Sequence, residues 1–259
     1  MEGIMIGKQR RLQRLLVGPQ QRCLLVALDH AAWLGPVKGI DCPTSIVRKV
    51  LAGGANALLM GPGFTRAVED VLHPSTAVVL RVSLTPGLAP EATQEAPLAT
   101  AETALRLDAD AVAVSVWFGR GGELAVMRYL GELLEQCDRF GMPVLAEMMP
   151  PPDKAYDPDA IAHAARIGFE AGADIVKTNY CGQVESFRHV IKSVPVPILV
   201  AGGPSNGEGD EESLQLVREV VEAGAAGIAF GRRIWQSPHP DLLVRKISAV
   251  LFASESGSA

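Results

Sequence analysis

The chain has 259 residues, 48% of them hydrophobic, and a formal net charge of −5. This length suits one large domain, and the absence of long charge runs argues against a nucleic-acid-binding protein. No apolar run approaches the roughly 18 residues that cross a bilayer, and the first residues lack the apolar core of a signal peptide. We therefore expect neither a membrane nor a nucleic-acid partner.

Residues 8–16 are predicted to form an N-terminal helix, with Lys8, Arg10, Arg11 and Arg14 on its solvated face. Segments with helical periodicity recur further on, for example 159–172, which ends at a glycine, and 210–225, which opens with acids. The last residues, 253–259, look unstructured. Apolar runs of strand length lie at 23–30, 57–60, 77–83, 111–118, 143–149, 174–180, 197–203 and 227–231.

Near-continuous apolar strands that alternate with helices indicate parallel strands covered by helices. Eight such strands in about 250 residues match the arithmetic of a (β/α)₈ barrel. We therefore predict an α/β protein, a single-domain TIM barrel over residues 1–252, with the helix at 8–16 plugging its floor. An open doubly wound sheet is the alternative, but no Gly-x-Gly-x-x-Gly follows the first strand.

The four cysteines, Cys23, Cys42, Cys137 and Cys181, show no Cys-x-x-Cys spacing. Free thiols in a reducing cytoplasm are the expected state. No set of His, Asp or Glu residues has metal-ligand spacing either, so we predict a reaction without a metal or another cofactor.

A lysine interrupts the strand "DIVKTNY" (174–180). Burying an unpaired ammonium costs several kcal/mol, so Lys177 needs a reason to lie there. In a barrel it falls near the carboxyl end of the sixth strand, the end that carries active sites. Burial favours the neutral amine, a nucleophile that forms a Schiff base with a ketone or aldehyde. The alternative is a lysine paired with a carboxylate at the strand end.

The first strand ends in "LDH", which places Asp29 and His30 at the same end of the barrel. An acid there can lie across the lumen from Lys177, orient it and carry protons during carbinolamine formation and dehydration. Taken alone, an Asp in this position is more often a helix cap or a loop hydrogen-bonder. His30 and Arg81, near the end of the third strand, are further candidates for contact with substrate or its phosphate. A salt bridge at the rim is the alternative for Arg81.

Glycine turns follow the last two strands, in "AGGPSNG" (201–207) and "FGRRIWQ" (230–236). Barrel phosphate sites are frequently built from these two loops. Three glycines allow close backbone approach and one arginine adds a bidentate contact, so we predict a phosphate site formed by Gly202, Gly203, Gly231 and Arg232. The alternative is that the glycines only form tight turns. Arg233 is expected to face solvent.

The motifs "LDH", "ADIVKTNY", "PVPILVAGGP" and "GRRIWQ" resemble the class I aldolases grouped with archaeal-type fructose-bisphosphate aldolase and 2-amino-3,7-dideoxy-D-threo-hept-6-ulosonate synthase. The resemblance extends over about residues 5–250. It implies that Lys177 is the Schiff-base lysine, that Asp29 handles protons, and that the glycine turns hold a sugar phosphate. It also implies a homo-oligomer, since family members often form decamers.

One segment departs from the family's pattern. Those aldolases usually carry a general acid/base tyrosine after the fifth strand, whereas "AEMMPPPD" puts Met149 at the tyrosine position and Pro151 at a following arginine. Methionine cannot donate a proton. Glu147 shares the face of Met149 one pleat deeper and is a candidate substitute, unless it is a structural glutamate held by a lysine or backbone amides. Tyr156, in the next loop, is the other candidate.

The sequence thus predicts a Schiff-base aldolase or transaldolase that makes or cleaves a carbon–carbon bond of a phosphorylated ketose. The substrates would be fructose 1,6-bisphosphate, or dihydroxyacetone phosphate with an aldehyde such as aspartate semialdehyde. Two alternatives stay open: a thiolase acting on a phosphorylated diketone, as in a related branch without the tyrosine, and a non-catalytic sugar-phosphate-binding barrel. Trp117 and Trp235 are expected to be packing residues, and Trp33 either lines the pocket or covers the core.

Overall fold

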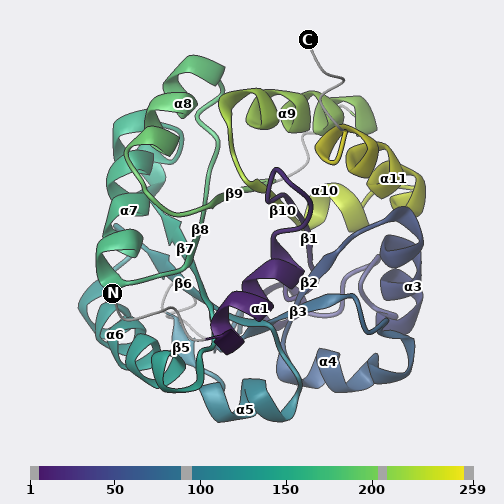
Figure 1. Cartoon of the computed structure of the whole chain (residues 1–259), viewed down its shortest axis with the longest axis horizontal. Coiled ribbons are helices and arrows are strands. Elements are labelled where there is room, and N and C mark those ends of the chain that lie inside the picture. Colours follow the sequence, from purple (N-terminus) through teal and green to yellow (C-terminus); the bar gives the residue numbers. More distant parts are fainter. Residues whose placement is uncertain (1–5, 89–94, 204–208, 254–259) are drawn as a thin grey trace.

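Eight parallel strands close into a barrel in a computed structural model of the chain, which describes residues 6–88, 95–203 and 209–253 (Figure 1). Their order around the barrel is β1-β10-β9-β8-β7-β6-β3-β2. The predicted (β/α)₈ barrel is confirmed, and the open sheet is wrong because β1 pairs with both β2 and β10. The strands are β1 (Cys23–Ala27), β2 (Ala57–Met60), β3 (Ala77–Arg81), β6 (Ala111–Trp117), β7 (Val144–Met149), β8 (Ile175–Thr178), β9 (Ile198–Ala201) and β10 (Gly227–Phe230).

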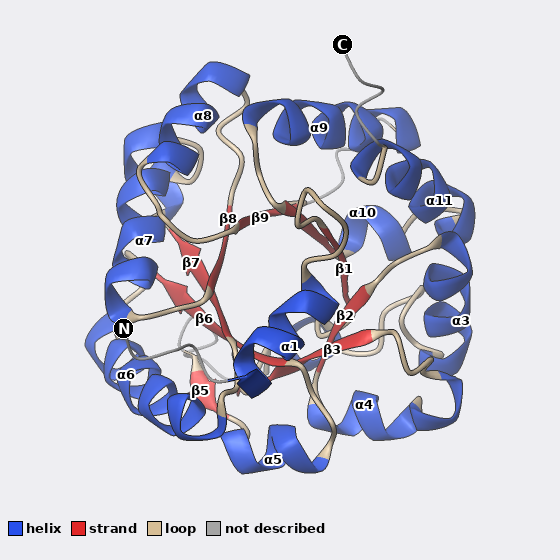
Figure 2. Cartoon of the chain, viewed as in Figure 1, coloured by secondary structure: helices blue, strands red, loops and turns tan. Residues whose placement is uncertain are grey.

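Helices surround the barrel (Figure 2). The predicted helices at 159–172 and 210–225 correspond to α7 and α9, and each ends at a glycine in the left-handed conformation. The other helices are α1 (Ile6–Leu15), α2 (Ala31–Leu34), α3 (Pro43–Gly53), α4 (Pro62–Ala67), α5 (Ala101–Arg106), α6 (Glu123–Phe140), α8 (Val184–Lys192), α10 (Arg232–Trp235) and α11 (Pro240–Leu251), beside α7 (Pro158–Ala171) and α9 (Asp210–Ala223). Single 3₁₀ turns lie at Glu69–Val71 and Pro152–Lys154.

The predicted domain limits, residues 1–252, stay a prediction, and the expected tail at 253–259 lies outside the described residues from position 254 onward. Within the part of the chain that the structure describes, no helix is both long and apolar enough to span a bilayer.

The N-terminal helix plugs the barrel floor, as predicted. In Figures 1 and 2, α1 lies across the barrel opening. Its buried leucines join the core inside the strands, with Leu12 at the edge and Leu15 and Leu16 fully packed. Among the described residues, α1 therefore covers this end of the lumen.

The basic face of α1 is only partly in solvent: Arg10 and Arg14 are exposed, as predicted, whereas Lys8 and Arg11 are half-buried. Lys8 pairs with Asp174 at 2.9 Å, and Arg14 pairs with the buried carboxylate of Asp110. These aspartates lie just before β8 and β6, on the barrel floor. Helical periodicity shows where the polar face lies but not which residues of a distant segment will cover it.

Strand side chains alternate between two cores. Outward residues pack against the helices, and inward residues form a separate cluster within the barrel. The inward positions are apolar near the floor but polar toward the carboxyl end, where they are Arg81, Ser115, Glu147 and Lys177. The strand register places Ser115 beside Glu147 and Glu147 beside Lys177. The alternating pattern thus collects the charged side chains in one layer.

The predicted strand at 77–83 is divided in two. β3 ends at Arg81, and Ser83–Leu84 (β4) pairs antiparallel with Ala96–Pro97 (β5). This small sheet brings Glu95 beside the carboxyl end of the barrel, where it accepts hydrogen bonds from the hydroxyls of Ser83 and Thr85.

Candidate active site

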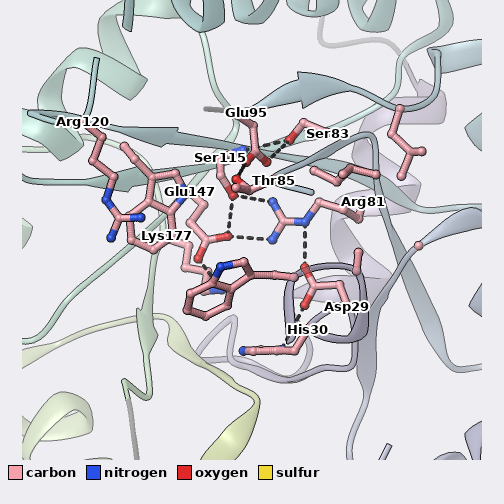
Figure 3. Close-up of a pocket in the computed structure, with 16 residues that line it drawn as sticks. Asp29, His30, Arg81, Ser83, Thr85, Glu95, Ser115, Arg120, Glu147 and Lys177 are labelled. Atoms are coloured by element: carbon pink, nitrogen blue, oxygen red, sulfur yellow. Dashed lines mark hydrogen bonds and ion pairs between the residues drawn. The ribbon is translucent and has the colours of Figure 1, made fainter. Parts of the chain in front are cut away.

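A pocket opens at the carboxyl end of the barrel, and Lys177 lies in its lining (Figure 3). The charged groups that share this pocket come from the ends of different strands, as in barrel enzymes generally. They are Asp29, Arg81, Glu95, Arg120, Glu147 and Lys177, with Ser115, Trp33 and Trp117 among the neutral side chains.

Lys177 is the third of four residues in β8 and is only 5% exposed. Its neighbours Ile175, two residues earlier in β8, and Leu199, beside it in β9, both belong to the apolar inner core. Its Nζ lies 2.7 Å from Oε1 of Glu147. This lysine is therefore buried inside the barrel and paired with a carboxylate, and its role as the Schiff-base amine stays a prediction.

Arg81 connects the two carboxylates of the site (Figure 3). Its Nε donates to Asp29 at 2.7 Å, one terminal nitrogen donates to Glu147 at 2.7 Å, and the other donates to Ser115 at 2.6 Å. Ser115 in turn donates to Glu147 at 3.0 Å. Arg81 therefore forms salt bridges, as one alternative predicted, but they lie inside the lumen and not at the rim.

Charges alternate along this network from Asp29 through Arg81 and Glu147 to Lys177. Burial raises the pKa of Glu147, but the Lys177 ammonium and the Arg81 guanidinium outweigh burial and lower the pKa to about 2. Burial also raises the pKa of Asp29, but Arg81 and His30 outweigh it and hold that pKa well below its ordinary value. The pKa of Arg81 lies above its ordinary value because the two carboxylates outweigh burial. Both carboxylates are therefore ionised at neutral pH.

His30 links the network to the turn after β10. Its Nδ1 lies 3.3 Å from Oδ1 of Asp29, and its ring packs edge-on against Trp235 with 5.6 Å between centroids. A Cβ atom at Gly231 would overlap the His30 ring. Glycine at position 231 therefore leaves room for the His30 ring. Trp235 is a packing residue, as predicted.

The other predicted phosphate-site residues lie outside the lining of the Lys177 pocket. Gly202 and Gly203 line a neighbouring hollow together with Tyr156, and Gly202 packs against the Phe230 ring. Gly203 has a left-handed backbone with φ of 66°, which favours glycine. The turns adjoin the site because β9 and β10 follow β8 around the barrel.

The two arginines after β10 behave differently. Arg233 donates to the carbonyl oxygen of Gly202 and pairs with Glu212 at 2.8 Å, so the expectation that it faces solvent is wrong. Arg232 carries a buried Nε that has no hydrogen-bond partner in residues 6–88, 95–203 and 209–253. Burial lowers the pKa of Arg232, and Tyr156 partly offsets this. Of the two, Arg232 is the cation left available to an anion.

The position that departs from the family's pattern is filled by a buried side chain. Met149 is 3% exposed and lies beside Trp117 in the strand register. Tyr156 is 60% exposed and lies in the hollow with Gly203, away from the lining of the Lys177 pocket. Of the candidate substitutes, Glu147 is the one in contact with Lys177.

The pocket residues that were not predicted as part of the site include Ser115, Glu95, Trp117 and Arg120. Glu95 gave no signal in the sequence, and Trp117, which was expected to be a packing residue, lines the pocket. The Arg120 guanidinium lies 4.1 Å above the Trp117 ring. For Ser115 a signal was available, because it is a polar residue within the apolar run "AVAVSVWF". Its side chain faces the lumen at the level of the charged side chains.

Neither thiol chemistry nor a metal cluster emerges from the described residues. All four cysteines are free, and Cys23 and Cys137 are buried. Among the residues that the structure describes, no group of three or more His, Cys, Asp or Glu side chains is arranged to hold a metal ion.

Comparisons with known proteins agree with this geometry. The chain is 34% identical over 250 residues to a 2-amino-3,7-dideoxy-D-threo-hept-6-ulosonate synthase of Halobacterium salinarum, covering 95% of this chain and 91% of that one. It is 31% identical over 256 residues to the 2-amino-4,5-dihydroxy-6-oxo-7-(phosphonooxy)heptanoate synthase of Streptomyces griseus, covering 98% and 93%.

Solved structures show the same fold. An archaeal fructose 1,6-bisphosphate aldolase superposes with a TM-score of 0.84 at 27% identity, covering 95% of this chain and all of that one. A second archaeal structure, with a catalytic lysine bound to the carbinolamine intermediate, gives 0.82 at 25% identity, covering 94% and 99%. Residues 23–237 match the family described as DeoC/LacD family aldolase. The chain belongs to this family of class I, Schiff-base-forming aldolases.

Proposed function

We propose that Lys177 is the amine that forms the Schiff base, and that the substrate is a phosphorylated ketose or ketone. The observation that carries this proposal is the position of its Nζ, inside the barrel at the carboxyl end and 2.7 Å from a carboxylate. A carbonyl held above the pocket would meet a nucleophile whose position is fixed by its ion pair. Such positioning supplies several kcal/mol of the barrier.

Glu147 is the proposed proton carrier for imine formation. It takes one proton from the Lys177 ammonium, and the resulting neutral amine attacks the carbonyl carbon. A second proton passes from the nitrogen to the carbonyl oxygen, which gives the neutral carbinolamine. Because the ammonium is a large part of what lowers the pKa of Glu147, its loss favours the protonated acid. That acid then donates its proton to the carbinolamine hydroxyl, water leaves, and the iminium faces a carboxylate again. The cycle needs no tyrosine at position 149.

Asp29 is proposed to handle the proton of the carbon–carbon bond step. Its carboxylate is held by Arg81 and His30 on the opposite side of the network from Lys177. Cleavage requires a base to take the proton of the hydroxyl next to the breaking bond, and condensation returns that proton to the new hydroxyl. Arg81, with all its nitrogens occupied, positions both carboxylates and is a positioning residue in this scheme.

The substrate's phosphate is proposed to bind at the turns after β9 and β10. Arg232 supports this because its buried Nε has no hydrogen-bond partner in the part of the chain that the structure describes, and a phosphate oxygen would accept from it. Gly203 offers an open backbone on the same side, with Tyr156 nearby. His30 and Gly231 then join this phosphate region to the catalytic network.

The relatives narrow the substrate class. The name of the Streptomyces griseus product describes a seven-carbon chain with an amino group and a phosphate ester, and that of the archaeal structures describes fructose 1,6-bisphosphate. We propose that this chain makes or cleaves a comparable bond, joining dihydroxyacetone phosphate to an aldehyde. We further propose that it acts as a homo-oligomer in the cytoplasm, where its four free thiols would persist.

Product analysis tests the proposal. The purified chain is incubated with fructose 1,6-bisphosphate, or with dihydroxyacetone phosphate and a panel of aldehydes, and the products are identified by mass spectrometry. An aldol product that wild-type protein forms and Lys177→Met does not is the expected result. Acyl transfer to a thiol acceptor from a phosphorylated diketone would instead establish the thiolase alternative, which the buried Met149 keeps open. Turnover that survives Lys177→Met would contradict the role of the lysine.

A further inference from the structure

Arg120 is a cation of the active-site pocket that has no anionic partner among the described residues. It lies in the loop between β6 and α6, and its guanidinium makes no hydrogen bond or ion pair with any residue that the structure describes. Figure 3 shows it beyond Lys177 and Glu147, with no dashed contact. The other two cations of the pocket, Arg81 and Lys177, are both paired.

The loop holds Arg120 in place. Its guanidinium lies over the Trp117 ring at 4.1 Å, a cation–π contact that leaves the edge of the fork free. The backbone N–H groups of Arg120 and Gly121 both donate to Oε1 of Glu123 at 3.1 Å. Gly119 and Gly121 adopt left-handed conformations on either side. The position of the guanidinium is therefore fixed from the backbone and from the ring.

Arg120 is half-buried, and no carboxylate of the described residues pairs with its guanidinium. Burial lowers the pKa of Arg120, with no opposing contribution from a nearby carboxylate. An anion that enters the pocket would supply the missing counter-charge, and a planar carboxylate or a phosphate matches the geometry of the guanidinium fork.

The strand order places Arg120 opposite the proposed phosphate turns. Going around the barrel, β9 and β10 lie on one side of the Lys177 strand, β8, whereas β7 and then β6 lie on the other. A substrate whose phosphate binds after β9 and β10, and whose carbonyl meets Lys177, extends its far end toward the loop after β6. The two cations, Arg232 and Arg120, thus lie beyond the two ends of the reacting chain.

We propose that Arg120 and Trp117 form an anion subsite for the acceptor aldehyde, which binds a carboxylate or phosphate at the end remote from the aldehyde carbon. This inference rests on the proposed function, because it assigns the second substrate of the same site. It makes an anionic acceptor the preferred one and a neutral aldehyde a poor one.

The test compares acceptors that differ in charge. Condensation with dihydroxyacetone phosphate is measured for glyceraldehyde 3-phosphate, aspartate semialdehyde and neutral glyceraldehyde, using wild type, Arg120→Met, Arg120→Lys and the exposed control Arg128→Met. Loss of a charge-assisted pair lowers kcat/KM for the anionic acceptor by about 10- to 100-fold in Arg120→Met. The neutral acceptor is unaffected, Arg120→Lys loses less, and Arg128→Met behaves as wild type. A larger loss with aspartate semialdehyde indicates that the subsite binds a carboxylate, and a larger loss with glyceraldehyde 3-phosphate indicates a phosphate.

Two further readouts separate this inference from the proposed function. Borohydride trapping of dihydroxyacetone phosphate reports the donor half alone and should be equal in wild type and Arg120→Met. Binding of the unreactive anions succinate and glycerol 3-phosphate is measured by calorimetry in an Arg232→Met background, where the turns contribute least, and does not depend on turnover. Arg120→Met should weaken at least one of them by about 10-fold or more. Equal affinity with and without Arg120, or an equal loss for charged and neutral acceptors, overturns the subsite.

Discussion

Replacing Glu147 with glutamine tests the charge network at its centre. The carboxylate receives Lys177 and Arg81, each at 2.7 Å, and Ser115 at 3.0 Å, all inside the barrel. Glutamine keeps the shape and an acceptor but removes the charge, so the ammonium is left buried without its anion. Breaking a buried pair in this way costs about 3–5 kcal/mol. The lowered pKa of Glu147, from 4.5 to about 2, gives a similar figure of about 3 kcal/mol.

A double-mutant cycle isolates the pair. Urea unfolding followed by circular dichroism is measured at pH 7 for wild type, Glu147→Gln, Lys177→Met and the double variant. Because Lys177→Met removes the cation that Glu147→Gln would strand, the double variant loses less stability than the two single changes together. We expect a coupling free energy of about 2 kcal/mol.

The contribution of Glu147 to the free energy of unfolding depends on pH. A carboxylate with a lowered pKa contributes stability above its ordinary value of 4.5, and that contribution is lost as the pH falls toward about 2. The stability difference between wild type and Glu147→Gln should therefore shrink through this window. The exposed pair Arg166 and Glu170 is the matched control, for which the coupling should stay below about 0.5 kcal/mol. A coupling as small as this for Glu147 and Lys177 would refute the buried network.

Three other predictions follow from burial in and around the barrel. Burial raises the pKa of Glu95, so its ionisation destabilises the fold as the pH rises above 4.5, and urea midpoints of wild type should fall relative to Glu95→Gln between pH 4.5 and 7. Burial raises the pKa of the Cys23 and Cys137 thiols to about 12, so an aromatic disulfide reagent should titrate two thiols in the native protein and four in urea; more than two in the native state contradicts the packing. A methyl group in Gly231→Ala would displace the His30 ring, so turnover should fall at least about 10-fold while the thermal midpoint changes little; unchanged turnover contradicts the role of His30.

The barrel and the position of Lys177 were predictable because they depend on local information. Strands buried on both faces are apolar along their whole length, and barrels bind ligands at their carboxyl ends, so a lysine in β8 is seen from the sequence alone. The floor plug follows in the same way from the length of the first helix. The inward face of each strand is also fixed by parity, which placed Glu147 and Met149 together.

Contacts between segments were not predictable to the same degree. The pairing of Glu147 with Lys177 depends on the register between β7 and β8, which no local pattern specifies. Glu95 reaches the pocket only because β5 pairs with β4. Arg120 sits in a glycine-rich loop whose path is set by the carboxylate of Glu123 and the ring of Trp117. The partners of Lys8 and Arg14 lie on strands far along the chain, which is why their face was taken as solvated.

Trapping of the imine tests the central claim most directly. Protein saturated with dihydroxyacetone phosphate is reduced with borohydride, and the adduct is located by intact mass and peptide mapping. The account predicts a single adduct of one dihydroxyacetone phosphate less one oxygen atom, on Lys177, formed by wild type and by Arg120→Met but not by Lys177→Arg. An unmodified protein at saturating ligand, or an adduct on another lysine, would contradict it.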